Sequence, residues 1–333
     1  MELSGIYAPV EDDLRALDAL LRAELASDDV FIGELVAHVL GAHGKMIRPA
    51  LVCLSALACG AAASGRAEGR AARVEIAAAV ELIHIASLVH DDVIDVADLR
   101  RGRATVNAVW GNQVAVLLGD YLFSKAFHLL ARLRAADLAA AMAWATVRMS
   151  QAEIKQIKYG NTPHTDEAIY FDIIEGKTAQ LMSAACRCGA MTAGAAVAEV
   201  EALAAFGLEW GMAFQITDDA LDVTSSASSL GKPIGSDIQT GKVTLPVIHA
   251  LRRAPERDRR RLETVLTSAN GDGEDGSPAE IREILSRHGG VEYALGTARV
   301  RAQRADAALE ALRDSSARRS LRALVEFVTV RTR

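Results

Sequence analysis

Two clusters of aspartates in this 333-residue chain share one spacing, DDxxD: DDVID at 91–95 and DDALD at 218–222. Each cluster stands near the C-terminal end of a long apolar stretch with helical periodicity, so its first and fifth residues project from one helix face. Carboxylates crowded at that end of a helix repel one another and oppose the helix dipole. A hard divalent cation such as Mg²⁺ removes this cost, because it accepts carboxylate, water and phosphate oxygens.

A single DDxxD is most simply a solvated acidic helix end, but two copies in similar apolar settings favour a metal–diphosphate site. Within each motif the second aspartate turns partly aside from the other two. The candidate metal ligands are Asp91, Asp92, Asp95, Asp218, Asp219 and Asp222.

Basic residues beside glycines accompany the acidic motifs. They occur in GKMIRP at 44–49, LRRGR at 99–103, GKT at 176–178, and GK at 231–232 and 241–242. One metal site does not need so many cations, whereas two bound diphosphates do: Arg grips phosphate through two hydrogen bonds and Lys acts as a point charge. The pattern GxxxxGK[ST] is absent from the sequence, which argues against nucleotide binding of the P-loop type.

The elements that must position these residues are helices. Apolar residues recur with helical spacing along most of the chain, and runs of alternating β-branched residues are lacking, so the sequence predicts an all-α helical bundle. The Ser- and Gly-rich segment 224–241 and the polar segment 270–278 predict loops. We expect a single domain over 1–333. Helices are expected over about 10–25, 29–41, 47–63, 70–97, 112–134, 136–159, 165–175, 177–194, 197–222, 240–252, 255–267, 277–287, 290–313 and 316–330.

Composition narrows the class of protein. Half of the residues are apolar, and the net charge of −6 comes from interspersed charges of both signs, which gives no sign of a nucleic-acid partner. The four cysteines fit no zinc pattern and are expected to be small buried thiols. We find neither a signal peptide nor a membrane-spanning segment in the sequence and expect a cytoplasmic protein.

The combined motifs closely resemble the trans-isoprenyl diphosphate synthases, or polyprenyl synthetases, in order and spacing from about residue 10 to the C-terminus; among these, the chain resembles the bacterial medium- and long-chain, octaprenyl-type enzymes. The resemblance implies a bundle of helices around a deep central cavity, usually a homodimer, with three Mg²⁺ ions between the aspartate motifs and an allylic diphosphate. The matching segments are GKMIRP at 44–49, HIASLVHDDVIDVADLRRG at 84–102, GD at 119–120, GKT at 176–178, FQITDDALD at 214–222 and GKPIGSDIQTGKVTLP at 231–246.

The resemblance also assigns residues to roles. It implies that Asp91 and Asp95 ligate two of the ions and Asp218 the third. The positions that match an isopentenyl diphosphate site are Lys45, Arg48, His84 and Arg101. The positions that match an allylic diphosphate site are Arg100, Lys177, Thr178, Gln215, Lys232 and Lys242, and all of these except Arg100 are also expected to steady the carbocation.

The implied reaction is the condensation of an allylic diphosphate with isopentenyl diphosphate to a linear all-trans product, with the 224–241 loop as a lid. Small residues at Ala86 and Ser87, one turn before the first motif, predict an open tunnel and a product of roughly C30 to C50. The candidate floor residues on the next helix are Tyr121, Phe123 and Phe127, whose alternative role is ordinary core packing.

Three alternatives stay open. A geranylgeranyl or farnesyl diphosphate synthase would share every motif and differ in product length. A class I terpene cyclase shares the fold and the first motif, but it needs no isopentenyl diphosphate site such as Lys45, Arg48 and Arg101. A non-catalytic helical scaffold would leave the paired carboxylates and glycine-flanked lysines unexplained.

Overall fold

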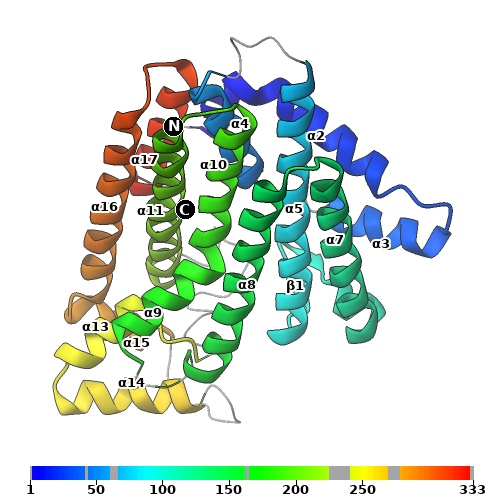
Figure 1. Cartoon of the computed structure of the whole chain (residues 1–333). Coiled ribbons are helices and arrows are strands. Elements are labelled where there is room, and N and C mark those ends of the chain that lie inside the picture. The colour runs from blue at the N-terminus through cyan, green and yellow to red at the C-terminus, as the bar shows by residue number, and fades with distance from the viewer. Residues whose placement is uncertain are drawn as a thin grey trace. The chain divides into compact units, whose positions relative to one another are not determined.

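The computed structural model describes residues 2–41, 44–60, 67–160, 162, 165–224, 241–268 and 278–330. Helices make up nearly all of the regular structure in these ranges, and two short strands are the exception (Figure 1). The predicted all-α fold class is therefore confirmed.

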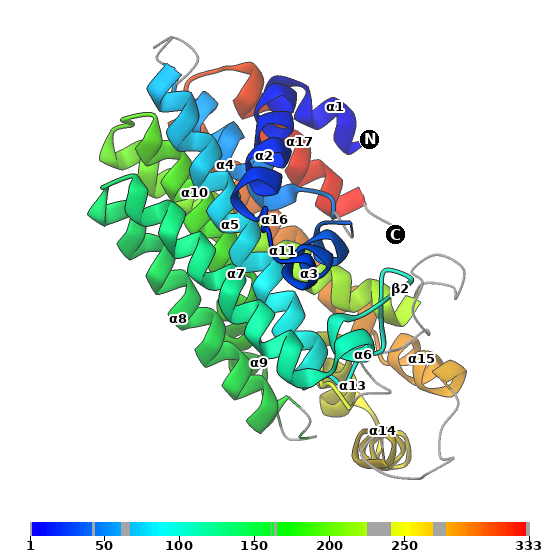
Figure 2. The ribbon, with the colours of Figure 1, turned by 90° about the vertical axis from the view of Figure 1, so that its right-hand side faces the viewer.

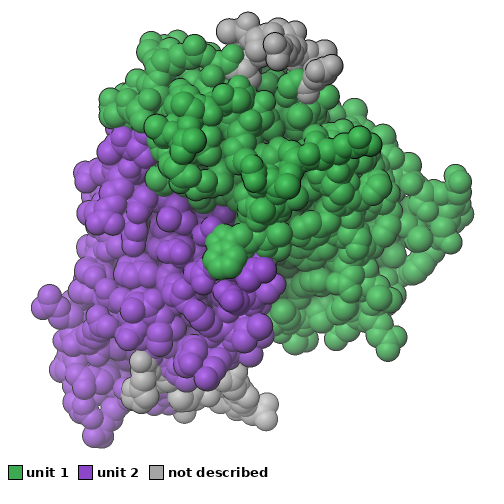
Figure 3. All heavy atoms as spheres, viewed as in Figure 1, with its two compact units in different colours: residues 1–146, 181–207, 309–323 green, residues 147–180, 208–308, 324–333 purple. Residues whose placement is uncertain are grey.

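The chain divides into two compact units (Figure 3). Unit 1 comprises 1–146, 181–207 and 309–323, and unit 2 comprises 147–180, 208–308 and 324–333. The elements up to the first motif and its hairpin are α1 (Leu3–Tyr7), η1 (Ala8–Val10), α2 (Glu11–Glu24), α3 (Val30–Leu40), α4 (Ile47–Ala58), α5 (Ala67–Ile94), β1 (Leu99–Arg100) and β2 (Arg103–Ala104).

The remaining elements are all helical, and four of them, α8, α10, α11 and α17, contain a boundary between the units. They are α6 (Val106–Trp110), α7 (Asn112–Arg132), α8 (Ala136–Tyr159), α9 (Glu167–Ile174), η2 (Glu175–Ala179), α10 (Gln180–Thr192), α11 (Val197–Thr224), α13 (Leu245–Arg253), α14 (Glu256–Ser268), α15 (Pro278–Arg287), α16 (Gly290–Ala308), η3 (Leu309–Ala311) and α17 (Ser316–Val330).

The core of unit 1 is built on α4 and α5. Helix α4 is apolar on nearly all sides and almost wholly buried, as expected for a helix enclosed by others. Helices α5 and α7 lie side by side in both views (Figures 1 and 2). Helices α4 and α10 approach closely because α10 has a glycine at the contact. A Cβ at Gly189 of α10 would lie 2.2 Å from the carbonyl oxygen of Val52 in α4.

A two-residue hairpin follows α5 and presents the arginines of the LRRGR segment. Leu99 pairs with Ala104 and Arg100 with Arg103, so Arg101 and Gly102 form the turn. Both have positive φ, 52° and 74°, as a type I′ turn requires. The sequence did not reveal these strands, because two residues are too short for any periodicity.

Neighbouring side chains fix the hairpin within unit 1. His38 of α3 bonds the carbonyl oxygen of Ala104 at 2.8 Å. Thr105 caps α6 by accepting from the amide of Ala108 at 3.3 Å, and its hydroxyl donates to the carbonyl of Ala97 at 2.6 Å. The segment after the first aspartate motif is thus tied to α3, to α6 and to itself.

Unit 2 has its own apolar core, formed mainly by the C-terminal half of α11 with α13, α14, α15 and α16. Trp210 is fully buried, and its indole nitrogen donates to the carbonyl of Leu324 at 2.8 Å. The helices α9 and α10 are joined by a π-helical turn, η2, so the chain stays helical from Glu167 to Thr192. The sequence predicted a break near Gly176, and this prediction is wrong.

Several expectations concern segments outside the described residues. The lid assigned to 224–241 falls almost wholly there, as does Lys232, and so does the loop expected at 270–278. The single domain and its central cavity stay predictions. By length and composition, one described helix, α7, is apolar enough to cross a membrane, with 39% of its apolar window buried. The absence of a membrane-spanning segment also stays a prediction.

Candidate active site

The first aspartate motif lies at the C-terminal end of α5 in unit 1. The amide of Asp95 donates to the carbonyl of Asp91 at 2.8 Å, so the helical turn continues and both carboxylates leave one side of it. Asp91 is partly exposed and Asp95 exposed. Asp92 is buried instead, and its Oδ1 accepts from Arg100 Nε at 2.7 Å. The protein therefore ties the middle aspartate to the hairpin and leaves the outer pair at the surface.

A pocket with about 650 Å³ of empty space adjoins this motif within unit 1. Three of its lining residues are hairpin arginines, an arrangement that suits a doubly charged phosphate group. Of the four positions predicted for isopentenyl diphosphate, the lining includes His84 and Arg101. The residues that line it are His38, Val39, Gly44, Glu81, His84, Ile85, Leu88, Val89, Asp92, Arg100, Arg101, Arg103, Ala104, Thr105 and Val106.

Electrostatics sets the protonation of His84. Burial and the charges of Arg48, Arg101 and Arg100 all lower its pKa well below 6.5. The imidazole is therefore neutral at neutral pH and can bind an anion through a hydrogen bond, without a charge of its own. Because the charge of Arg48 reaches His84, Arg48 belongs to the same neighbourhood although it does not line the pocket.

Glu81 is a buried carboxylate in this pocket that sequence reasoning missed. It lies one turn before His84 on α5 and is 4% exposed. Burial raises the pKa of Glu81, and the charges of Arg48 and Arg101 partly offset this rise. Its signal in the sequence was an acidic residue on the otherwise apolar face of a long helix.

The GKMIRP segment is arranged by its backbone. The Tyr7 hydroxyl donates to the carbonyl oxygen of Lys45 at 3.0 Å, which ties the segment to the N-terminal helix. The guanidinium of Arg101 lies over Gly44, because a Cβ there would be 2.8 Å from its Nη1. A side chain at position 44 would therefore displace the Arg101 guanidinium, whereas the Lys45 side chain is exposed and does not line the pocket.

The GD pair at 119–120 also receives a physical explanation. A Cβ on Gly119 of α7 would lie only 2.1 Å from His90 Nε2 of α5. This nitrogen lies 3.1 Å from the carbonyl oxygen of Val116 and 3.6 Å from Asp120 Oδ1. Gly119 and Asp120 therefore help to position His90, which directly precedes the first motif.

The second motif, near the C-terminal end of α11 in unit 2, has a similar division. Asp218 and Asp222 are partly exposed, and Asp219 is buried. Asp219 Oδ1 accepts from Gln215 Nε2 at 2.8 Å, and Oδ2 accepts from the Tyr170 hydroxyl at 2.6 Å. Tyr170 was missed, since it stands 49 positions before Asp219 in the sequence and so gives no local signal.

This network continues to Thr178, whose hydroxyl donates to Gln215 Oε1 at 2.8 Å. Gln215 is thereby held at both ends of its amide, in the orientation that these bonds assign. A second pocket, within unit 2 and with about 660 Å³ of empty space, contains four of the predicted allylic-site residues: Lys177, Thr178, Gln215 and Lys242. Lys232 lies outside the described residues, and Arg100 lines the unit 1 pocket.

The carboxylate groups of the two aspartate motifs are suitable ligands for Mg²⁺. Each motif presents two carboxylates one helical turn apart with a buried middle aspartate held by the protein, and such oxygens are the ligands that Mg²⁺ prefers. Within the described part of the chain, no group of three or more His, Cys, Asp or Glu side chains forms a ready-made cluster. An ion here would need oxygens from water or substrate as well.

The five residues expected to set chain length all lie in unit 1. Ala86 is fully buried, and the Ser87 hydroxyl donates to the carbonyl of His84 at 2.8 Å. Phe123 lies 5.9 Å from the ring of His90, and Lys125 of the same helix lies over the ring of Tyr121 at 5.7 Å. Phe127 is 36% exposed. The structure places these residues, and their role stays a prediction.

Comparison with known proteins gives a consistent result. Residues 29–284 match the family described as Polyprenyl synthetase. The chain belongs to this family. It is 35% identical over 321 residues to the octaprenyl diphosphate synthase of Haemophilus influenzae, covering 96% of this chain and 94% of the relative. It is 41% identical over 298 residues to the short chain isoprenyl diphosphate synthase of Methanothermobacter thermautotrophicus, covering 88% of each.

A crystal structure of polyprenyl synthase from Caulobacter crescentus, complexed with calcium and isoprenyl diphosphate, matches with a TM-score of 0.92 and 33% identity. The match covers 100% of this chain and 98% of that one. The predicted resemblance is thus confirmed, and this polyprenyl synthetase is an enzyme of the prenyltransferase class. Its described residues form one cation-rich pocket in unit 1 and one in unit 2 that contains Lys177 and Lys242.

Proposed function

We propose that this polyprenyl synthetase condenses an allylic diphosphate with isopentenyl diphosphate to give a longer all-trans prenyl diphosphate and free diphosphate. The observation that carries the proposal is the presence of two pockets that each place cationic side chains in a largely apolar lining, with different residues in each. The unit 1 pocket combines three arginines with a neutral histidine. The unit 2 pocket combines two lysines with the Thr178–Gln215 pair. Two anionic substrates call for two such sites.

Isopentenyl diphosphate is assigned to the unit 1 pocket. Arg101 and Arg48 bind its phosphates as cations, Lys45 adds a mobile charge, and His84 contributes an uncharged hydrogen bond. Burial of Glu81 beside these arginines limits the net positive charge of the pocket. The bound substrate is thereby held by direct contacts with the protein.

The allylic diphosphate is assigned to the aspartate motifs and the lysines. Asp91, Asp95 and Asp218 would hold three Mg²⁺ ions, and when bound these ions supply neutralisation of charge on the departing diphosphate. Asp92, Asp219 and Asp222 would support them by fixing the geometry. The calcium and isoprenyl diphosphate named for the Caulobacter crescentus structure support a divalent cation in this role.

The chain's own residues then have distinct tasks. Arg100, Lys177, Lys232 and Lys242 stabilise the negative charge that grows on the leaving group. The oxygens of Thr178 and Gln215 face the allylic cation, and the double bond of isopentenyl diphosphate attacks it. The new carbon–carbon bond leaves a cation that loses a proton, which we assign to the released diphosphate. Exclusion of water, with the 224–241 segment as lid, prevents quenching to an alcohol.

We further propose a product of roughly C30 to C50. The small side chains of Ala86 and Ser87 support it, and so does the match to an octaprenyl diphosphate synthase. The 41% identity to a short chain synthase keeps the C15 and C20 products as the second candidate. Product length therefore requires measurement.

A homodimer is proposed as the assembly, in the cytoplasm. Large apolar side chains lie exposed on one face of α8: Trp144 is 57% exposed, Val147 45% and Ile154 67%. Residues spaced by three and seven share a helix face, so these three form one apolar stripe that a second copy would cover. Light scattering of the purified protein tests this; a monomer at micromolar concentration would refute it.

Product analysis is the test of the reaction. Purified protein with Mg²⁺ and labelled isopentenyl diphosphate is incubated separately with geranyl, farnesyl and geranylgeranyl diphosphates, and products are sized by mass spectrometry. Asp91→Ala and Asp218→Ala should each lower kcat by at least about 10³-fold. Normal rates in either variant would refute the assigned roles. Cyclic products would indicate a terpene cyclase, and binding without turnover a scaffold.

A further inference from the structure

Lys177, assigned above to the allylic diphosphate, is already paired with a carboxylate of its own unit. Its Nζ donates to Glu153 Oε2 at 2.5 Å, and the two side chains are only 27% and 15% exposed. The other oxygen of Glu153 accepts from Gln156 Nε2 at 3.4 Å. Gln156 and Lys177 both line the unit 2 pocket, so Glu153 contacts two lining residues without itself being one of them.

The turn that carries Lys177 is fixed to α8 by its backbone. A Cβ at Gly176 would lie 2.7 Å from the Cβ of Ala152 and 2.8 Å from the carbonyl oxygen of Arg148, so this π-helical turn packs directly on α8. π-helical turns inside α-helices are frequent at functional sites because they reorient the side chains that follow. Here Lys177 and Thr178 occupy the turn.

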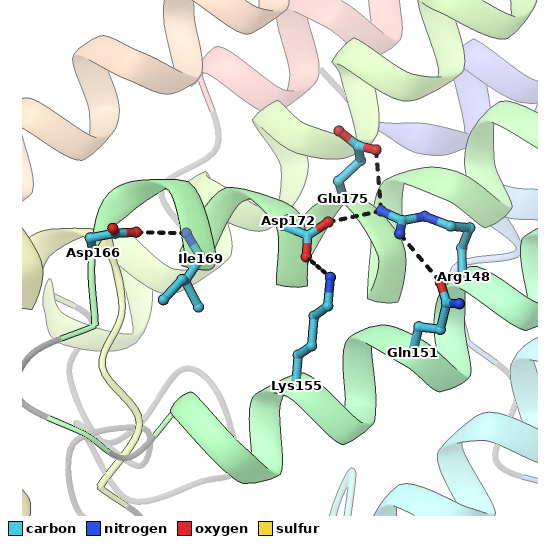
Figure 4. Close-up of polar contacts among 7 residues, drawn as sticks. All are labelled: Arg148, Gln151, Lys155, Asp166, Ile169, Asp172 and Glu175. Atoms are coloured by element: carbon cyan, nitrogen blue, oxygen red, sulfur yellow. Dashed lines mark hydrogen bonds and ion pairs between the residues drawn. The ribbon is translucent and has the colours of Figure 1, made fainter.

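Ion pairs at the N-terminal side of the same turn strengthen this contact. Figure 4 shows the carboxylate of Asp172, on α9, between Lys155 and Arg148 of α8, and the Arg148 guanidinium also faces Glu175. Arg148 Nη2 lies 3.0 Å from Asp172 Oδ1 and 3.6 Å from Glu175 Oε1. Helix α8 thus holds the backbone of the turn, and Glu153 holds the side chain of its lysine.

A carboxylate beside an anion-binding lysine opposes diphosphate binding in the ground state. Tighter binding of the diphosphate therefore does not explain why Glu153 stands beside Lys177. An ammonium group has three donors, and Glu153 accepts one of them, which directs the others. A donor held in place stabilises the charge that develops during diphosphate departure without reorganising at that moment. Such an interaction raises kcat more than it tightens substrate binding.

We propose that Glu153 is a positioning residue that orients the Lys177 ammonium toward the departing diphosphate. The proposal rests on the proposed function and adds to it a carboxylate that acts through Lys177. The substitution Glu153→Gln keeps the shape and the hydrogen bond to Gln156 while removing the charge that holds Lys177.

A matched control exists in the same unit. Glu209 pairs with Arg301 at 3.1 Å, and their side chains are 19% and 23% exposed, close to the burial of the Glu153–Lys177 pair. Neither residue lines the unit 2 pocket. Glu209→Gln therefore breaks an ion pair of similar burial and should lower the unfolding temperature to a similar degree, with kinetic constants like those of the wild type.

The experiment measures kcat and both KM values for wild type, Glu153→Gln and Glu209→Gln, with thermal unfolding of each. Loss of an oriented charged hydrogen bond predicts a kcat about tenfold to a hundredfold lower in Glu153→Gln. The KM for the allylic diphosphate should stay unchanged or fall, and the KM for isopentenyl diphosphate should stay unchanged. A wild-type kcat in Glu153→Gln, or a higher allylic KM at unchanged kcat, would overturn the proposal.

Calorimetric binding of unreactive farnesyl thiodiphosphate with Mg²⁺ supplies a readout that needs no turnover. Glu153→Gln should bind this analogue at least as tightly as the wild type, because a repulsive charge is gone. Weaker binding would overturn the positioning role. A wild type that binds the analogue but elongates no primer would overturn the proposed function instead, so the two failures are distinguishable.

Discussion

Replacing Gly119 by alanine should damage both stability and catalysis through one contact. The added Cβ would lie 2.1 Å from His90 Nε2 and 2.4 Å from Cδ2, whereas ordinary contacts begin at 3.4 Å. The imidazole or the α5–α7 spacing must therefore yield by about 1.3 Å. Because His90 bonds the Val116 carbonyl at 3.1 Å and its ring lies tilted against that of Phe123 at 5.9 Å, it cannot move without losing these contacts.

The magnitude follows from three terms. Alanine in place of glycine gains about 0.5–1 kcal/mol of helix stability. Overpacking of a closely packed contact costs about 1–3 kcal/mol, and the lost hydrogen bond adds roughly 1 kcal/mol. The net expectation is a loss of about 1–3.5 kcal/mol. Gly33→Ala is the matched control, since nothing lies within 4 Å of its added Cβ inside α3, and it should gain about 0.5–1 kcal/mol.

Thermal unfolding and steady-state kinetics at several Mg²⁺ concentrations test this. His90 directly precedes Asp91, and a shift of about 1 Å in a catalytic group can lower a rate on the order of 10²-fold. Gly119→Ala should therefore unfold below the wild type, turn over more slowly and require more Mg²⁺. If it unfolds together with Gly33→Ala and keeps the wild-type kcat, the explanation of the GD pair is wrong.

Two further predictions concern unit 1. Burial raises the pKa of Glu81, so the folded protein favours the protonated carboxyl group. The stability that this preference contributes is full below pH 4.5, is lost as the pH rises through the folded-state pKa, and stays lost above it. Glu81→Gln should therefore unfold at a higher temperature than the wild type at pH 7 to 8, with the difference vanishing below pH 4.5. The KM for isopentenyl diphosphate should stay unchanged or fall, because the substitution removes a negative charge beside the arginines of the pocket. A difference in unfolding temperature that is constant at all pH values would contradict the first expectation. Ser87→Phe should shorten the product to C20 or less by mass spectrometry, and an unchanged product would remove Ser87 from the tunnel wall.

The helices were predictable where the apolar period of 3.6 residues is set by local sequence. The pattern over 197–222 anticipated α11, which ends at Thr224, and the pattern over 112–134 anticipated α7. The break expected near Gly176 did not occur, because this glycine is explained by a distant contact with α8 and not by a helix end. Sequence periodicity carries no information about such a contact.

The residues of the candidate site also fall into two groups, those that the local sequence reveals and those that depend on distant contacts. The aspartates and glycine-flanked cations carry their chemistry in residue type and spacing, so the sequence could identify them. Glu153 and Tyr170 act through Lys177 and Asp219, which are 24 and 49 residues away. Those partners are set by how α8, α9 and α11 pack in unit 2. Glu81 lies between the two cases, since its place one turn from His84 was visible but its burial was not.

Backbone strain identifies the same neighbourhood independently. Among the described residues, four that are not glycine have positive φ, and three of these belong to the motifs of unit 1: Met46, Val96 and Arg101. Each costs about 1 kcal/mol or more in this conformation, and a β-branched residue such as Val96 is especially unfavourable there.

Selection for stability alone would place Asn or Gly at these positions, as type I′ turns prefer at the position of Arg101. Arg101 instead keeps a guanidinium that lies over Gly44 and lines the pocket with Glu81, itself a buried acid. Arg101 and Glu81, which both depart from local rules, line one pocket, and Arg101 is a cation of the kind that an anionic substrate needs. The strain at Arg101 is therefore a backbone observation that supports a binding site in this pocket, beside the residue types of the motif.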